Sequence, residues 1–141
     1  ARITDNVISA NSTYGVQIYP DAQGTVVSRN IIVRNGKGIV FGGDNGTTSN
    51  SNRVQDNLIA YPRVGYNLES YWPPRPGGGN VATGNCLWGR EGGPGLDPGL
   101  TGVTLRGNRV GKPRLSVSFA LLADPGCRAI AARLRRAHPG P

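Results

Sequence analysis

The sequence predicts an all-β solenoid, a fold in which short strands wind into coils that stack on one another. Three observations favour this class. A short motif recurs every 23 to 28 residues, and periods of this kind are typical of stacked repeats. Glycine and proline are abundant, with 22 and 11 residues among 141, while charged residues make up only 17%. Long amphipathic helical patterns are nearly absent, so a turn-rich β chain fits best.

The recurring motif places an asparagine between apolar positions, in the form apolar-x-x-Asn-x-apolar. It occurs five times, and successive asparagines are 24, 27, 28 and 23 residues apart. The five are Asn6, Asn30, Asn57, Asn85 and Asn108. Asparagine tolerates a positive φ and bonds to nearby backbone, which suits a bend. Equivalent positions on stacked coils lie about 4.8 Å apart, so we expect the five side chains to form one hydrogen-bonded column.

A second motif, a glycine before a short apolar strand, follows the first three asparagines. Gly15, Gly38 and Gly65 come nine, eight and eight residues after them. We expect each glycine to lie at a bend, because glycine adopts a positive φ without steric cost. Together the two motifs predict that each repeat forms two or three sides of one coil.

The segments ITDNVI, VSRNIIVRNGKGIVF and VQDNLI resemble coils of right-handed parallel β-helix proteins, the superfamily of pectate lyases and related polysaccharide-acting proteins. The resemblance implies a right-handed parallel β-helix of about four to five coils over residues 1–110. Residues 111–141 would then form a last strand, a turn and a short basic helix that covers the end of the solenoid. This architecture hosts lyases, hydrolases, epimerases and adhesins, so it implies a fold more firmly than an activity.

The stretch GNCLWG and a late cysteine resemble the C-terminal coils of secreted bacterial members of this superfamily. This resemblance implies a secreted or cell-surface protein, and it implies that further N-terminal coils of the same protein are its packing partner. Cys86 and Cys127 are either two buried free thiols or one disulfide, and secretion favours the bond. No apolar run approaches the roughly 20 residues of a membrane span, so we expect no membrane partner.

The strands that follow the three glycines predict one outer face of the coils. Residues one and three positions after each glycine should point inward, among them Ile39, Leu68 and Tyr66. The residues expected on the outer face are Gln17, Tyr19, Asp21, Lys37, Asp44, Asn67, Glu69 and Tyr71. Of these, we expect Gln17, Tyr19, Asn67, Glu69 and Tyr71 to bind substrate.

Two aspartates on this face suggest a metal site. Asp21 and Asp44 occupy the same repeat position on neighbouring coils, about 5 Å apart if the coils stack regularly. Paired carboxylates can share Ca²⁺ or divide acid and base roles. The resemblance to polysaccharide lyases, which use calcium and a basic side chain, implies Lys37 as base and Asp44 as its catalytic partner, although no lyase signature surrounds Lys37. The alternative is that both aspartates are ordinary turn residues.

Aromatic residues gather near a proline- and glycine-rich excursion at residues 73–79. Loops that leave a rigid solenoid on one side commonly carry binding residues. We therefore expect Tyr71, Trp72 and Arg75 to contact sugar rings. The alternative is that these rings only cover the base of the loop.

The formal net charge of +8 is concentrated in the C-terminal part of the chain. Residues 103–141 carry eight Arg or Lys against one acid, whereas residues 1–102 carry eight against seven. A basic tail can bind nucleic acid or another anionic polymer, or it can simply be solvated.

The function that the sequence favours is a secreted carbohydrate-interacting domain, with cleavage or modification of a polysaccharide as its stronger form. One alternative is a structural or adhesive scaffold without catalysis. Another is binding of nucleic acid or a further anionic polymer by the tail. We expect a polysaccharide, and not nucleic acid, as the partner.

Overall fold

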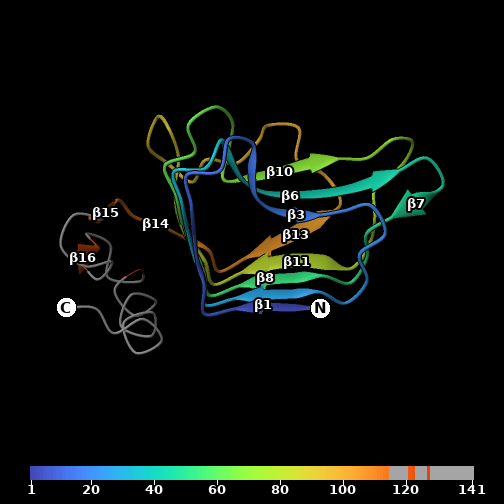
Figure 1. Ribbon diagram of the computed structural model, residues 1–141, viewed down its shortest axis with the longest axis horizontal. Helices are drawn as coiled ribbons and strands as arrows, with labels where there is room; N and C mark the ends of the chain where they lie inside the picture. Colours follow the sequence, from blue (N-terminus) through green and yellow to red (C-terminus); the bar gives the residue numbers. More distant parts are fainter. Residues whose placement is uncertain (115–120, 123–126, 128–141) are drawn as a thin grey trace.

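The computed structural model describes residues 1–114, 121–122 and 127, and these residues wind as a parallel β-solenoid with three sides (Figure 1). This confirms the predicted all-β solenoid. Side 1 contains β1 (Arg2–Thr4), β4 (Val26–Ser28), β8 (Arg53–Gln55), β11 (Asn80–Thr83) and β13 (Val103–Arg106). Side 2 contains β2 (Val7–Ser9), β5 (Ile31–Val33), β9 (Leu58–Ala60), β12 (Cys86–Trp88) and β14 (Arg109–Val110). Side 3 contains β3 (Tyr14–Ile18), β6 (Lys37–Asp44) and β10 (Leu68–Tyr71).

Three short strands lie outside these parallel sides. β7 (Thr47–Thr48) folds back on β6 as an antiparallel pair. β15 (Pro113–Arg114) pairs antiparallel with β16 (Leu121–Leu122). The expected helical tail and its role as a cap fall outside the described residues. Within the described part of the chain, no helix is long and apolar enough to cross a membrane.

The core consists of apolar side chains that repeat coil by coil and point into the solenoid. Val27 and Val54 come from side 1, Ile32 and Ile59 from side 2, and Phe41 from side 3, and each is at most 1% exposed. Parallel pairing in register stacks equivalent residues directly above one another, as with Ile8, Ile32 and Ile59. A short repeat with few apolar residues per coil thus builds one continuous core.

The five predicted asparagines form one stacked column, as expected. At each step the backbone N–H and the Nδ2 of one asparagine donate to Oδ1 of the next; for Asn30 and Asn57 the distances are 2.8 and 3.1 Å. The residue before each asparagine makes the bend, with φ between 56° and 65°. Shorter ladders of the same kind join Asn11 to Asn35 and Asn52 to Asn80 at the two other corners.

We expected Gly15 and Gly38 to lie at bends, where glycine can adopt a positive φ, and this prediction is wrong. Gly15 and Gly38 lie inside β3 and β6 and neither has a positive φ. A Cβ on Gly15 would lie 2.7 Å from Ile32 Cγ2, and one on Gly38 would lie 2.4 Å from the carbonyl oxygen of Asn67. Glycine is needed here because the backbone approaches the core closely.

A second apolar cluster covers the outside of side 2. It contains Ile31, Val33, Leu58, Ala60 and Cys86, together with Cys127 from the C-terminal segment. Cys86 and Cys127 form a disulfide with Cα atoms 5.3 Å apart, which confirms the favoured alternative. The bond fastens Cys127 to the outer face of this side.

We expect Asn57→Ala to lower the free energy of unfolding by about 3 kcal/mol, because Asn30 loses the acceptor for its buried backbone N–H. Asn6→Ala, at the exposed end of the same column, should cost less than about 1 kcal/mol. Urea unfolding of both variants measures the difference. Equal losses would show that the buried column does not hold the coils together.

Reduction of the disulfide should lower the free energy of unfolding by about 3–4 kcal/mol, the chain-entropy value for a loop of this size. Unfolding curves with and without dithiothreitol measure this loss. A Cys86→Ser, Cys127→Ser double variant is the control, and its curve should not respond to the reductant. Identical curves for the oxidised and reduced native chain would contradict the stabilising role.

Candidate functional site

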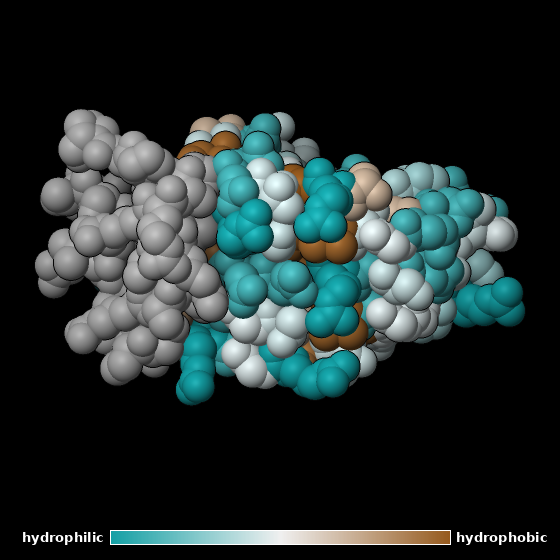
Figure 2. Space-filling model, turned by 90° about the horizontal axis from the view of Figure 1, so that it is seen from below, coloured by the Kyte–Doolittle hydropathy of each residue, from teal (hydrophilic) through white to brown (hydrophobic). Residues whose placement is uncertain are grey.

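The outer surfaces of the three sides differ in chemistry. Side 1 is mostly hydrophilic on its outside (Figure 2), where Arg53 and Gln55 bond to each other. The outside of side 2 is the apolar cluster that includes the disulfide. Side 3 carries exposed tyrosines on a sheet whose inner residues are buried. Side 3 is therefore the candidate site.

The third coil enters side 3 two residues later than the sequence spacing suggested. Ile39 pairs with Leu68, so Glu69 lies beside Val40 and Tyr71 beside Gly42. The two extra residues form a bulge at the corner, where the N–H groups of Val64 and Gly65 both donate to the carbonyl of Gly36. A shift of two residues keeps the alternation of the strand but changes every cross-strand neighbour.

This shift corrects two expected positions. Tyr66, expected to point inward, is 38% exposed. Asn67, expected among the outward substrate-binding residues, is completely buried, and its Nδ2 donates to the carbonyl of Pro94 at 2.9 Å. Asn67 stands opposite Gly38, where its side chain turns away from the outer face. It therefore cannot contact a ligand on that face.

Three tyrosines surround a shallow hollow on side 3. Its volume is about 260 Å³, and its lining consists of Tyr14, Gln17, Tyr19, Val40 and Tyr71. We call these five residues the tyrosine face. Tyr14 and Tyr19 come from β3 and its end, and Tyr71 ends β10, two strands away. Tyr14 was not among the expected binding residues, although its place directly before the strand glycine was visible in the sequence.

Gly42 allows the two outer tyrosines to approach each other across β6. A Cβ at this position would lie 3.1 Å from Tyr19 Cδ2 and 2.9 Å from the carbonyl oxygen of Tyr71. Tyr19 is 37% exposed and Tyr71 is 62% exposed. Both rings are thus held on a rigid sheet while a large part of each faces solvent.

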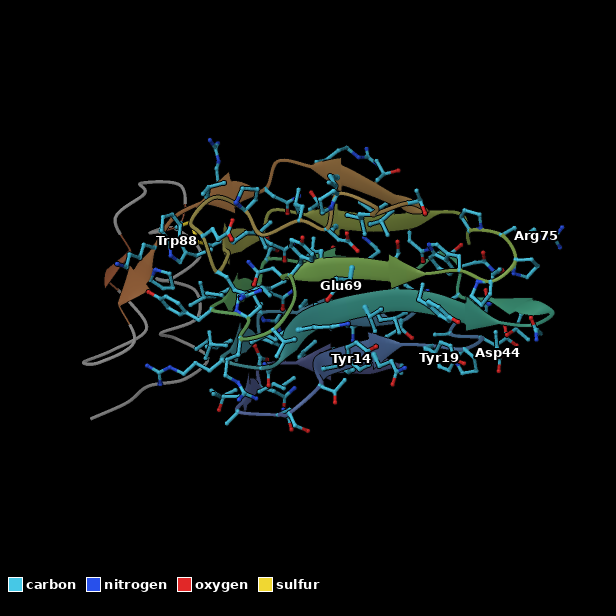
Figure 3. The ribbon with its side chains drawn as sticks, turned by 90° about the horizontal axis from the view of Figure 1, so that it is seen from above. Tyr14, Tyr19, Asp44, Glu69, Arg75 and Trp88 are labelled. Atoms are coloured by element: carbon cyan, nitrogen blue, oxygen red, sulfur yellow. A yellow bond between two sulfur atoms is a disulfide. The ribbon has the colours of Figure 1, made fainter. Side chains whose placement is uncertain are left out.

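Desolvation raises the pKa of the Tyr19 hydroxyl above its ordinary value of 10.0, and the nearby Asp44 carboxylate raises it further. The neutral phenol is therefore the form present at all physiological pH values. In this form the hydroxyl can both donate and accept a hydrogen bond. Figure 3 shows Tyr14, Tyr19 and Asp44 along one row, with Glu69 across from them.

Lys37 and Glu69 form an ion pair beside the hollow. Lys37 Nζ lies 3.7 Å from Glu69 Oε1 and 5.5 Å from the centre of the Tyr14 ring. The two side chains are 32% and 13% exposed. Lys37 therefore lies on the same side of the molecule as the tyrosine face, and its ammonium group is already engaged by a carboxylate and a ring.

Asp21 and Asp44 each accept a hydrogen bond within their own turn. Asp44 Oδ1 accepts from the backbone N–H of Asn45 at 2.7 Å, and Asp21 Oδ1 accepts from Gln23 Nε2 at 2.9 Å. Among the described residues, no three acid, histidine or cysteine side chains converge to hold a metal ion. Two carboxylates are a sparse set for Ca²⁺, which takes six to eight oxygens. The calcium site stays a prediction.

The remaining two expected contacts lie apart from the hollow. Trp72 packs partly buried against the core, and its Nε1 donates to the carbonyl of Thr101 at 2.8 Å. This contact fits the alternative in which the ring covers the base of the loop. Arg75 is exposed on the excursion that follows β10 (Figure 3).

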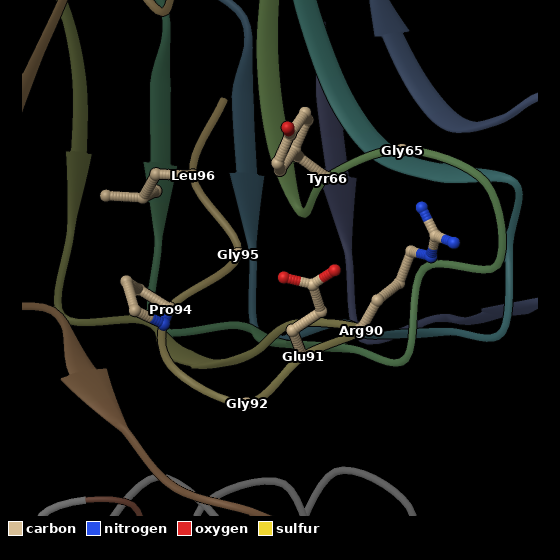
Figure 4. A pocket seen from close by; sticks show the side chains of 8 residues that line it. All are labelled: Gly65, Tyr66, Arg90, Glu91, Gly92, Pro94, Gly95 and Leu96. Atoms are coloured by element: carbon tan, nitrogen blue, oxygen red, sulfur yellow. The ribbon is translucent and has the colours of Figure 1, made fainter. Parts of the chain in front are cut away.

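A second hollow of about 270 Å³ lies near the corner that precedes β10 (Figure 4). Tyr66, Arg90 and Glu91 contribute its polar side chains. Arg90 Nη1 donates to the carbonyl of Val64 at 2.8 Å, so this arginine is engaged by the corner itself. We regard the hollow as a gap beside a glycine-rich loop, distinct from the tyrosine face.

Residues 1–69 match the family model described as a right handed beta helix region. A search of curated proteins and a search of solved structures each found no match. The matched residues include the first two complete coils, the bulged corner and the start of β10. The same parallel pairing continues beyond them through β11, β12, β13 and β14. Residues 1–69 are therefore similar to the right handed beta helix family, and the parallel solenoid that continues beyond them agrees with that similarity.

Proposed function

We propose that this protein is a secreted carbohydrate-binding β-helix domain, and that the tyrosine face holds the sugar. The observation that carries the proposal is the gathering of Tyr14, Tyr19 and Tyr71 around one open hollow on a rigid sheet. Tyrosine offers an apolar ring for the C–H face of a pyranose and a hydroxyl for its polar edge. Fixed rings lose little conformational freedom when a ligand binds.

Polar groups beside the rings support the same ligand class. Gln17 is exposed and lines the hollow, and its amide offers both donors and an acceptor to sugar hydroxyls. The neutral Tyr19 hydroxyl, which lies beside Asp44, can also accept a hydrogen bond from a sugar hydroxyl. The paired charges of Lys37 and Glu69 leave little net charge at this edge. The surface thus favours a hydroxyl-rich ligand over one recognised by charge alone.

Secretion is part of this proposal. A disulfide that fastens the C-terminal segment is compatible with an oxidising compartment. Cleavage of the polysaccharide is the stronger form of the function. It requires Lys37 to leave Glu69 and act as a base, with Asp44 as its partner. Assays for new reducing ends or unsaturated uronate products test this form directly.

We expect Tyr19→Ala and Tyr71→Ala each to weaken carbohydrate binding about tenfold, the loss of one ring contact worth about 1.4 kcal/mol. Tyr66→Ala is the matched control, because Tyr66 is 38% exposed against 37% for Tyr19 but lies outside the hollow. A glycan panel identifies a ligand, and isothermal titration calorimetry then measures the affinities. A chain that binds no glycan supports the scaffold alternative, and equal losses in all three variants would place the ligand elsewhere.

The calcium prediction has its own test. If Asp21 and Asp44 share Ca²⁺, millimolar calcium should raise the melting temperature of the native chain and Asp44→Asn should abolish the rise. Asp97→Asn is the control, because Asp97 also accepts a backbone N–H in its own turn, from Gly99. An unchanged melting temperature in the native chain would rule out the metal site and leave carbohydrate binding untouched.

A further inference from the structure

The tyrosine face carries two aromatic platforms, that is, two ring surfaces on which a sugar can stack. At one end Tyr19 and Tyr71 belong to a single cross-strand row, because both lie against Gly42 of β6. These two rings therefore act as one platform. At the other end Tyr14 pairs with Lys37, whose ammonium group lies 5.5 Å from the centre of the Tyr14 ring. Tyr14 is thus a second platform, separate from the first.

The two platforms are separated along the strand direction. Tyr14 begins β3 and Tyr19 follows its last residue. At about 3.3 Å per residue, the Cα atoms of these two tyrosines lie up to about 16 Å apart. A single pyranose is similar in size to a tyrosine ring, so it cannot contact both platforms at once. An extended run of roughly three sugars has the length that joins them.

The sheet between the platforms offers an apolar surface and one exposed polar side chain. Val40 is only 5% exposed and lies between Gln17 and Glu69 in one cross-strand row. Gln17 is exposed and lines the hollow, so its amide can bond to the hydroxyls of a sugar held between the platforms. A glycan that lies along β3 would therefore contact a ring, an amide and a further ring in succession.

A path that starts at Tyr14 and crosses the coils is interrupted. The next coil contributes Lys37, whose Nζ is paired with Glu69 Oε1 at 3.7 Å. Neither of these charged side chains lines the hollow, and Tyr66, one coil further, lines the other hollow. From this end the tyrosine face is therefore continuous along β3 and not across the coils.

We propose that the tyrosine face binds an extended oligosaccharide of roughly three sugars along β3, and that Tyr14 determines the length required. This inference rests on the proposed carbohydrate binding, and it narrows the ligand from any sugar to a chain that reaches both platforms. The lining side chains stand on the outer face of the sheet. A further coil beside β3 would extend this face without covering it.

A length series tests this inference. Isothermal titration calorimetry compares the affinities of the native chain for oligomers, from monosaccharide to hexasaccharide, of a glycan that the panel identifies. The affinity should rise about tenfold where the oligomer becomes long enough to add the Tyr14 contact, the value expected for one ring, and then level off. Tyr14→Ala should remove this rise. Tyr66→Ala is the control, because the Tyr66 ring lies outside the hollow, and it should keep the rise.

Three other outcomes would overturn the inference. Equal affinities of the native chain for the monosaccharide and the hexasaccharide would show a single platform, while carbohydrate binding itself would stand. A rise that Tyr14→Ala keeps and Tyr66→Ala removes would show that the glycan crosses the coils. An absence of binding at every length would overturn this inference together with the proposed function. Circular dichroism establishes that each variant folds, and Tyr14→Leu replaces Tyr14→Ala if the latter does not.

Discussion

Each coil of this protein satisfies the polar groups at its corners only through the neighbouring coils. Asn57 shows this most clearly, because its Oδ1 accepts from Asn30 while its own N–H and Nδ2 donate to Asn85. Its Nδ2 also donates to the carbonyl of Val27, two strands back on side 1. The side chain is fully buried, so a lost partner would leave a polar group without water or protein. The coil spacing, the strand register and the positions of the outer side chains all depend on this column.

The fold was predictable from the sequence because this constraint repeats. An asparagine in every repeat, with apolar residues three before and two after it, is enough to indicate stacked coils, and the five asparagines do stack. The disulfide between Cys86 and Cys127 also agreed with the favoured interpretation. The position of Cys127 could not be predicted, because the apolar residues on the outside of side 2 look like further core residues in a linear pattern.

The candidate site was predicted only in part, because the structure of one corner, the one before β10, was not visible in the sequence. The bulge at Val64 and Gly65 adds two residues to one corner, and no residue type marks such an insertion in the sequence. It moves Asn67 into the interior and sets Glu69 beside Val40 instead of Gly42. Tyr19 and Tyr71 were expected on one face, but their approach across Gly42 depends on the shifted register. Alternation predicts which side a residue faces, whereas its neighbours on that side depend on the loop between strands.

The three sides of the solenoid have chemically different outer surfaces. Side 2 carries the apolar cluster and the disulfide to Cys127, side 1 presents a polar surface, and side 3 presents tyrosines on a sheet packed on the core. The central claim is that side 3 is the ligand-binding surface. The chain has five tyrosines, so ring-labelled tyrosine NMR during titration with a bound glycan resolves them individually. We expect shifts for Tyr14, Tyr19 and Tyr71 and none for Tyr61 and Tyr66; shifts confined to Tyr61 and Tyr66, or unchanged spectra at saturating glycan, would contradict the claim.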